Sequence, residues 1–221
     1  MWWVSLARPQ QADALEPLLS SKESHSASSR REPFRSQFVI ARGALRIILS
    51  RYVSVEPARL DFADGPHGKP ALVPSASLPD IRFNVSHSGD LMACAVASGR
   101  EIGVDIERLR TIPEADAIAA MVFTPTEAAA ARAAAHGHPE EWFLRCWVRK
   151  EALLKAIGLG IAAGATNREQ NSDWAASPAF TVRDLETVSG FVGALAVEGG
   201  EGRVRYMTPS AEISGLRLTP A

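Results

Sequence analysis

The sequence predicts an α+β fold made of two similar halves. Strong helical periodicity over residues 35–52 and 141–157 alternates with short apolar runs that are typical of strands. A helix with apolar and basic residues, and a pair of neighbouring strands, occur once in each part of the chain. We therefore expect a boundary near residue 110, with one half over residues 1–110 and the other over residues 111–221.

The first half is expected to begin with a strand over residues 2–7 and a short helix over 10–19. The stretch 20–31 is polar and rich in serine, so we expect a mobile loop there. The helix over 35–52 is predicted because its apolar residues recur at helical spacing, while arginines share another face. A turn-rich stretch over 64–70 follows. The remaining strands of this region are expected over residues 82–85, 91–97 and 102–106.

The second half is expected to open with a connector over 108–113 and a helix that starts at Thr124. Thr124 can cap this helix, Pro125 suits its first turn, and Glu127 completes a capping box. This alanine-rich helix is expected to end near Gly137, and the helix over 141–157 to end before Gly158. A loop over 162–178 and strands over 180–182, 190–197 and 203–207 complete the prediction.

Composition limits the possible functions. The chain has 221 residues and a net charge of −1, which gives no indication of nucleic-acid binding. Cys94 and Cys146 lie in apolar segments and form neither a metal-binding pair nor a disulfide framework, which fits a reducing cytoplasm. We find no signal peptide and no apolar run long enough to span a membrane, so we expect a cytoplasmic protein.

Three carboxylates are the strongest indication of chemistry. Asp105 and Glu107 lie in the apolar run Ile102–Glu107, and alternate residues of a strand project from the same face. Glu151 and Lys155 are four residues apart in a predicted helix and also share a face. Such a set can converge on one hard divalent cation, and the lysine would suit a phosphate held by that cation.

These four residues also have an ordinary structural explanation. Asp105 and Glu107 could be solvated on an exposed strand face, and Glu151 with Lys155 could be a weakly stabilising surface pair. Against the first explanation, Asp and Glu are depleted in strands, and like charges on one face repel each other. A bound cation would remove that repulsion.

A second group of residues suits a small polyanion. Its members are Arg30, Arg31, Arg35, Lys69, Ser86 and His87. The serine and histidine follow a strand beside turn amides, and the arginines make the most basic region of a nearly neutral chain. Each of these side chains alone would more often be structural or simply exposed. The glycine motifs of P-loop and dinucleotide-binding folds are absent from the sequence.

Three motifs together resemble the 4′-phosphopantetheinyl transferases, specifically the long, surfactin-synthetase-activating type. They are Gly68-Lys-Pro70, then Phe83-Asn-Val-Ser-His-Ser-Gly89 with Gly103-Val-Asp-Ile-Glu107, then Trp147-Val-Arg-Lys-Glu-Ala-Leu-Leu-Lys155 with Gly158-Leu-Gly160. The resemblance covers roughly residues 1–200 and is densest between 68 and 160. The motifs are specific as a set, whereas each alone is weak.

The resemblance implies a Mg²⁺-dependent enzyme that moves the 4′-phosphopantetheine group of coenzyme A to a serine hydroxyl of an apo acyl or peptidyl carrier protein. The other product would be 3′,5′-ADP, and the pathway could be fatty-acid, polyketide or nonribosomal peptide biosynthesis. It implies a monomer of two pseudo-symmetric halves, each a small, mostly antiparallel sheet packed with a long helix. The first half would carry the coenzyme A phosphate-binding loops and the second the catalytic helix.

The resemblance also implies roles for individual residues. Mg²⁺ would be held by Asp105, Glu107 and Glu151, and the catalytic residues would be Glu151 and Lys155. Coenzyme A would be bound by Arg30, Arg31, Arg35, Lys69, Ser86, His87 and Lys155. The segment 111–140 would help to choose the carrier protein. From charge alone, the candidate carrier contacts are Arg108, Arg110, Arg145 and Arg149.

Two other functions fit the same residues. A Mg²⁺-dependent phosphohydrolase or nuclease would use the carboxylates with water as the nucleophile. A non-catalytic module could bind coenzyme A or a carrier protein, although all three carboxylates are present.

Overall fold

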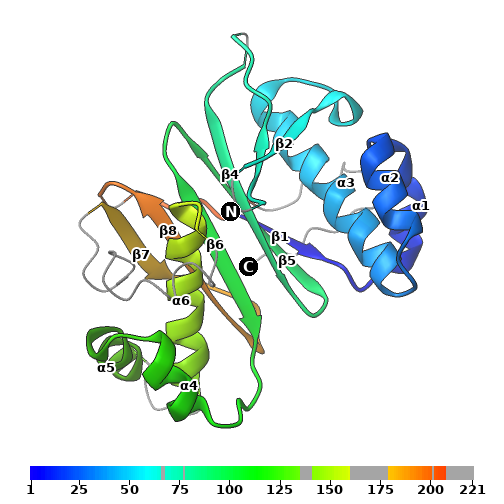
Figure 1. The fold of residues 1–221 in the computed structure, drawn as a ribbon. Coiled ribbons are helices and arrows are strands. Elements are labelled where there is room, and N and C mark those ends of the chain that lie inside the picture. Colours follow the sequence, from blue (N-terminus) through cyan, green and yellow to red (C-terminus); the bar gives the residue numbers. More distant parts are fainter. Residues whose placement is uncertain (66–67, 77, 135–140, 160–178, 201, 208–221) are drawn as a thin grey trace.

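The computed structural model describes residues 1–65, 68–76, 78–134, 141–159, 179–200 and 202–207. These residues form the predicted α+β fold, with helices packed on small antiparallel sheets (Figure 1). The strands are β1 (Trp2–Ser5), β2 (Phe62–Asp64), β3 (Pro70–Leu72), β4 (Ile81–Ser88), β5 (Leu91–Ser98), β6 (Ile102–Arg108), β7 (Phe180–Asp184) and β8 (Phe191–Glu198). The α-helices are α1 (Ala12–Leu15), α2 (Ser21–Ser28), α3 (Phe34–Val53), α4 (Ala115–Val122), α5 (Pro125–Ala134) and α6 (Trp142–Ala156). Short 3₁₀ turns are η1 (Pro9–Gln11), η2 (Glu16–Leu18) and η3 (Pro57–Arg59).

The strands form two main sheets, one in each half of the fold. The first has the order β1-β5-β4 and the second the order β6-β8-β7, with antiparallel neighbours in both. β2 and β3 make a separate antiparallel pair. Sheet membership therefore changes between β5 and β6, a few residues before the expected boundary. The division into residues 1–110 and 111–221 stays a prediction.

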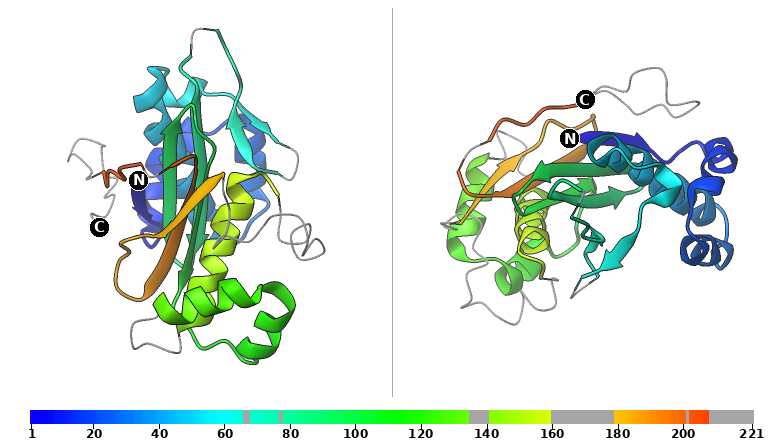
Figure 2. Two further views of the ribbon diagram at one scale, coloured as in Figure 1. Left: turned by 90° about the vertical axis from the view of Figure 1, so that its left-hand side faces the viewer. Right: turned by 90° about the horizontal axis from the view of Figure 1, so that it is seen from above.

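The helices cover the outer faces of the sheets, and an apolar layer joins the inner faces. α3 packs on the first sheet through side chains such as Ile48 and Phe83, and α6 packs on the second through Leu153 and Ala194. Figures 1 and 2 show α1–α3 on one side of the strands and α4–α6 on the other. Between the sheets lies a third cluster. It includes Trp3, Leu91, Ala93, Val104, Ile106 and Leu195.

The two sheets meet where β4 lies beside β6. Here side chains of β4 take the place of backbone acceptors. The amides of Val104, Ile106 and Arg108 donate to the side chains of Asn84, Ser86 and Ser88 at 2.9, 3.3 and 3.0 Å. Each donor follows its acceptor by 20 residues, so the two strands run parallel and in constant register. We call this row of three bonds the β4–β6 seam.

Gly103 lets α6 lie directly on β6. A Cβ atom at this position would be 2.1 Å from the Ala152 carbonyl oxygen and 2.4 Å from the Ala156 amide nitrogen. Both are backbone atoms of α6, so neither can move without displacing the helix. The glycine therefore sets the distance between the strand and the helix that carry the predicted site.

Several predicted elements are confirmed. The helices over 35–52 and 141–157 correspond to α3 and α6. The capping box is also present: the Glu127 amide donates to Thr124 Oγ1 at 3.1 Å, and the Thr124 amide donates to the Glu127 carboxylate at 2.8 Å. The loop expected over 162–178 and the helix end near Gly137 lie outside the described residues.

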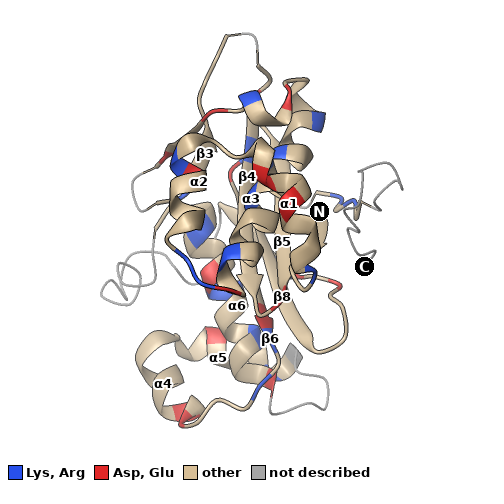
Figure 3. Cartoon of the chain, turned by 90° about the vertical axis from the view of Figure 1, so that its right-hand side faces the viewer, with Lys and Arg blue, Asp and Glu red and all other residues tan. Residues whose placement is uncertain are grey.

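The expected mobile loop over residues 20–31 is wrong, because Ser21–Ser28 form helix α2. Its start is a capping box in which the Ser20 hydroxyl accepts the Glu23 amide and the Glu23 carboxylate accepts the Ser20 amide. Glu23 also pairs with Arg46, whose side chain is only 2% exposed. Glu23 ties this polar helix to α3 through ion pairs with Arg42 and Arg46, and Figure 3 shows acidic and basic residues interspersed over α1–α3.

Other differences are smaller. The helix α4 and the strand pair β2–β3 were not predicted, and residues 203–207 are not a strand. This last segment nevertheless bonds to the start of the chain, since the Met207 amide donates to the Met1 carbonyl at 2.9 Å. None of the helices in the described part of the chain is long and apolar enough to cross a membrane.

Replacement of Gly103 by alanine should destabilise the fold by about 1–3 kcal/mol, because the added methyl group would overlap the backbone of α6. Urea unfolding measures this change. Gly200→Ala is the matched control, since a Cβ there meets no atom within 4 Å. Equal stabilities of the two variants would contradict the close approach of α6 to β6.

Candidate active site

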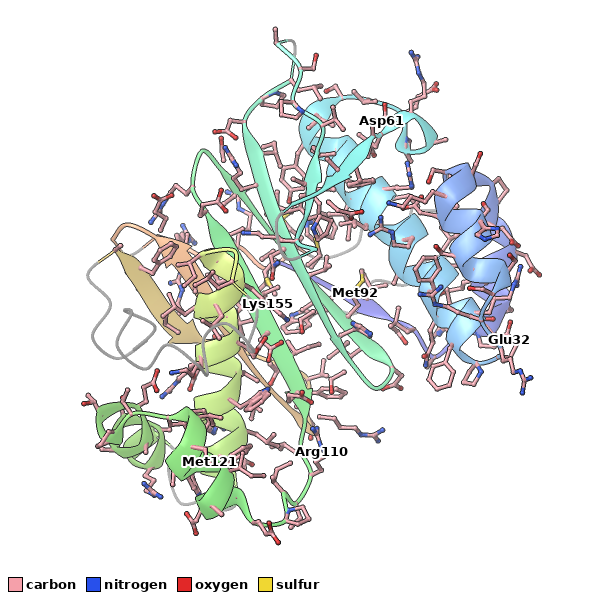
Figure 4. The ribbon with its side chains drawn as sticks, in the orientation of Figure 1. Glu32, Asp61, Met92, Arg110, Met121 and Lys155 are labelled. Carbon is pink, nitrogen blue, oxygen red and sulfur yellow. The ribbon has the colours of Figure 1, made fainter. Side chains whose placement is uncertain are left out.

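β6 and α6 bring the predicted carboxylates together. Asp105 and Glu107 project toward α6, while Val104 and Ile106 project into the apolar layer between the sheets, as the strand alternation predicted. From α6, Lys155 Nζ donates to Asp105 Oδ1 at 2.7 Å. Figure 4 shows Lys155 where α6 meets the strands.

Ser86 holds Asp105 in place from the first half. Its hydroxyl donates to Asp105 Oδ1 at 2.7 Å and accepts the Ile106 amide at 3.3 Å. Lys155 Nζ also donates to this hydroxyl, at 3.2 Å. The Ser86 side chain is therefore buried, and its hydroxyl group is fully engaged by Asp105, the Ile106 amide and Lys155.

Ser88 does for Glu107 what Ser86 does for Asp105. Its hydroxyl donates to Glu107 Oε2 at 2.8 Å and accepts the Arg108 amide at 3.0 Å. Arg110 also donates to Glu107 Oε2, at 2.7 Å. Ser88 was not predicted as a site residue from the sequence. Its signal was present, because Ser88 is two residues after Ser86 and shares its face of β4.

Glu151 is the carboxylate with the most unusual surroundings. Its Oε1 atom is buried and has no hydrogen-bond partner among the described residues. Burial raises the pKa of Glu151 from 4.5 to about 7, and repulsion from Asp105 and Glu107 adds to the rise while Lys155 opposes it. Burial also raises the pKa of Asp105, against the attraction of Lys155. The site therefore concentrates negative charge away from water.

The residues present fit a hard divalent cation in part. Asp105 Oδ2 and Glu151 Oε1 are both buried oxygen atoms without a hydrogen-bond partner in the described structure, and carboxylate oxygens suit Mg²⁺. The other Asp105 oxygen is bonded to Lys155 and Ser86. Among the described residues, no three His, Cys, Asp or Glu side chains lie close enough to form a ready-made cation site. Oxygen atoms of a bound phosphate would have to complete the coordination.

The other predicted ligand-binding residues lie around this centre rather than in it. Lys69 Nζ donates to Glu101 Oε2 at 2.9 Å, to the Ile102 carbonyl at 3.2 Å and to the Ala156 carbonyl at 3.3 Å, so it links the start of β6 to the end of α6. His87 is exposed, on the face of β4 opposite Ser86.

The three predicted arginines lie before and at the start of α3, apart from the carboxylates. The Arg30 guanidinium stacks on the Phe38 ring at 4.1 Å and also donates to the Ser26 carbonyl. Arg35 pairs with Glu16 at 2.6 Å, while Arg31 is exposed. Figure 4 shows Glu32, which follows Arg31, well separated from Lys155.

Two residues of the catalytic helix pair with neighbouring elements. Arg149, expected as a carrier contact, is 8% exposed and forms bonds of 2.6 and 2.8 Å with both carboxylate oxygens of Asp184. Its burial makes it unsuitable as a surface contact. Lys150 pairs with the fully buried Glu127 at 3.0 Å, which ties α6 to α5.

Comparison with known proteins decides the family. Over 206 residues the chain is 34% identical to the 4′-phosphopantetheinyl transferase HetI of Nostoc sp. (strain PCC 7120 / SAG 25.82 / UTEX 2576). The aligned region covers 90% of this chain and 87% of the relative. The chain belongs to the 4′-phosphopantetheinyl transferase superfamily. The family model of that name matches residues 101–195, which include Asp105, Glu107 and the whole of α6.

Two further members of the superfamily each match over about half of their length. The 4′-phosphopantetheinyl transferase Sfp of Bacillus subtilis (strain 168) is 33% identical over 118 residues, covering 53% of this chain and 50% of the relative. The 4′-phosphopantetheinyl transferase AcpT of Salmonella typhi is 38% identical over 113 residues, covering 51% and 56%. The predicted family and enzyme class, a 4′-phosphopantetheinyl transferase, are confirmed.

The raised pKa of Glu151 makes the stability of this 4′-phosphopantetheinyl transferase depend on pH. The folded protein holds the proton up to a pH of about 7, whereas the reference value is 4.5, so the stabilising contribution is lost as the pH rises between these values. In metal-free buffer, Glu151→Gln should therefore gain in melting temperature relative to wild type between pH 5 and pH 8, by at least about 3 °C. Glu56→Gln, at an exposed position, is the control. A constant difference across this range would contradict the buried carboxylate.

Proposed function

We propose that this chain transfers the 4′-phosphopantetheine group of coenzyme A to a serine hydroxyl of an acyl or peptidyl carrier protein. The observation that carries the proposal is the Glu151 carboxylate. It has a buried, unpartnered oxygen and a pKa near 7, beside Asp105, Glu107 and Lys155. A base whose pKa is close to the working pH is effective in proton transfer. Membership of the superfamily supplies the reaction to which this geometry belongs.

In the proposed reaction Glu151 accepts the proton of the carrier serine, directly or through a water molecule. The serine oxygen then forms a bond to the phosphorus that carries the pantetheine arm. The bond from that phosphorus to the bridging pyrophosphate oxygen breaks, and the electron pair leaves with 3′,5′-ADP. Lys155 lies one helical turn after Glu151 and is placed to stabilise the negative charge of the pyrophosphate oxygens. The protein contributes mainly by positioning and by charge stabilisation.

Asp105, Glu107 and Glu151 would hold Mg²⁺ together with oxygen atoms of the coenzyme A pyrophosphate. Bound Mg²⁺ would neutralise negative charge on the reacting phosphate. Support for this assignment comes from the two unpartnered buried oxygens and from the repulsion by Asp105 and Glu107, which adds to the effect of burial in raising the pKa of Glu151.

The remaining coenzyme A contacts are proposed on the basis of the motifs. We assign Lys69, Ser86, His87 and Lys155, with Arg30, Arg31 and Arg35, to phosphate groups of coenzyme A. Lys69 and Ser86 would exchange their present partners for phosphate oxygens, since Lys69 now pairs with Glu101 and Ser86 with Asp105. His87 and Arg31 are exposed, so they could bind phosphate oxygens without first giving up a buried partner.

The carrier protein is proposed to dock beside α4 and α5. Met121 of α4 is 65% exposed, Arg108 is the last residue of β6, and Arg110 lies on the connection from β6 to this helix. Exposed arginines suit an acidic carrier protein. We further propose that the enzyme works in the cytoplasm, because the buried free thiols Cys94 and Cys146 suit a reducing compartment. On the basis of the family resemblance we also propose that it works as a monomer.

Glu151→Gln should abolish transfer, because the amide cannot accept the serine proton, while the fold and coenzyme A binding are retained. The measurement is intact-mass spectrometry of several apo carrier proteins incubated with the enzyme, coenzyme A and Mg²⁺. Wild type should add one phosphopantetheine mass, and the variant should react at least about 100-fold more slowly. Wild-type rates from Glu151→Gln would overturn its assignment as the base. A wild-type protein that modifies no carrier would count against the proposed function.

Asp105→Asn should raise the Mg²⁺ concentration needed for half-maximal transfer by at least about tenfold, because a charged oxygen ligand is lost. Thermal stabilisation by Mg²⁺ in the presence of coenzyme A should weaken in parallel, which gives a readout other than activity. Asp64→Asn, on β2 and exposed, is the control. An unchanged metal titration would exclude Asp105 as a ligand.

The phosphohydrolase alternative predicts a different product. Incubation with coenzyme A and Mg²⁺ but no carrier protein should leave coenzyme A intact if the chain is a transferase. Release of phosphopantetheine under these conditions would instead identify water as the nucleophile.

A further inference from the structure

A cavity lies against the second sheet, on the face opposite to the one that carries the carboxylates. It has a volume of about 480 Å³ and is lined by both main sheets and by residues 202–207. Figure 2 shows this last segment, in orange-red, on the same side of the molecule as the N-terminus. The small side chains Ala95 and Ala97 of β5 and the aliphatic side chains Leu195 and Val197 of β8 form part of its wall.

The cavity is distinct from the candidate active site. Ile102 of β6 lines it, and Ile102 lies on the same face of β6 as Val104 and Ile106. Asp105 and Glu107 project from the other face of this strand, toward α6. A ligand in the cavity would therefore be separated from the carboxylates by the sheet itself.

Five arginines line this cavity, and none of its lining residues in the described part of the chain is acidic. They are Arg51, Arg100, Arg183, Arg203 and Arg205. Within the described residues, none of the five forms a salt bridge, whereas arginines elsewhere do, such as Arg46 with Glu23 and Arg149 with Asp184. Gathering unpaired positive charges around one concave surface is unfavourable unless an anion compensates them.

Two of the arginines are held in fixed positions by backbone carbonyl groups. Arg100 donates to the Glu198 and Gly200 carbonyls at 2.5 and 2.7 Å, and Arg183 donates to the Gly202 carbonyl at 2.5 Å. The Nε atom of Arg183 is buried and has no acceptor in the described structure. Carbonyl partners orient a guanidinium without neutralising its charge, so these two side chains remain cationic and pre-organised.

We propose that this cavity binds a small phosphate-bearing anion. Guanidinium groups match phosphate oxygens in geometry and charge, and several of them around one cavity suit more than one phosphate. The volume suits a small molecule rather than an extended polymer, and the net charge of the chain is only −1. The ligand could be an inorganic polyphosphate or an organic bisphosphate, because the wall combines arginines with aliphatic side chains.

The proposal is tested by calorimetric titration of the full chain with inorganic pyrophosphate and, in a second arm, fructose 1,6-bisphosphate. Both arms contain neither coenzyme A nor a divalent metal, because coenzyme A itself carries phosphate groups and would compete for the cavity. The variants and the chemical-shift changes below separate binding in the cavity from binding at β6 and α6. We expect binding in at least one arm that weakens as the salt concentration rises. Tighter binding of the bisphosphate would identify an organic ligand, and tighter binding of pyrophosphate an inorganic one. No binding in either arm would overturn the proposal.

The double variant Arg203→Gln with Arg205→Gln should bind at least about tenfold more weakly, because two charge-assisted bonds are lost. Both side chains are exposed, so the fold should be retained. The matched control is Arg8→Gln with Arg59→Gln, which changes net charge equally but lies outside the cavity. If both double variants bound the ligand equally weakly, the loss would reflect the net charge of the protein, and the proposed binding site in the cavity would be overturned.

Amide chemical-shift changes in a ¹⁵N-labelled sample locate the ligand. They should include Ala97 and residues 202–207, and changes confined to the surroundings of Asp105 would contradict the cavity. The double variant should keep its full transferase rate in phosphate-free buffer, since neither arginine is assigned to the reaction. Failure of the cavity proposal is thereby separated from failure of the proposed function.

Discussion

The β4–β6 seam is the interaction on which the rest of the site depends. Two sheets meet there without main-chain pairing, so the amides of β6 need other acceptors. Asn84, Ser86 and Ser88 supply them, and the two serine hydroxyls then have one proton left to donate. They donate it to Asp105 and Glu107. The bonds that join the halves therefore also orient the carboxylates, and binding chemistry and domain packing are parts of one network.

The catalytic helix adds the second constraint. Gly103 allows α6 to approach the backbone of β6, and this approach places Lys155 against Asp105 and buries Glu151 nearby. Burial raises the pKa of Glu151 to about 7, and repulsion from Asp105 and Glu107, which one lysine does not offset, adds to the rise. The packing of the surrounding apolar clusters stabilises the fold enough to keep these carboxylates close together despite their repulsion. The same repulsion makes the site receptive to a cation and provides a base that works near neutral pH.

Alternation along β6 separates two kinds of environment. One face carries Asp105 and Glu107 toward α6, and the other carries Val104 and Ile106 into the apolar layer. The cavity with unpaired arginines lies on this second side, beyond Ile102. A single strand thus faces acidic chemistry on one side and a basic cavity on the other. The sheet between them keeps opposite charges from neutralising each other.

Periodicity and local capping were sufficient to predict α3, α6, the start of α5 and the shared face of Asp105 and Glu107, because these features depend on residues close in sequence. The Ser-rich stretch 20–31 was mispredicted although Ser20 and Glu23 form a local capping box, because helix α2 has no apolar periodicity and Glu23 pairs with distant Arg46. The same limit explains why Arg149 was taken for a surface residue and why Ser88 was overlooked. Their partners, Asp184 and Glu107, are brought to them only by the packing of separate strands and helices. The residue types that could perform the chemistry can be read directly from the order of the amino acids. Which of their atoms are buried, paired or left available follows from the packed fold, since those properties arise from contacts between segments far apart in the chain.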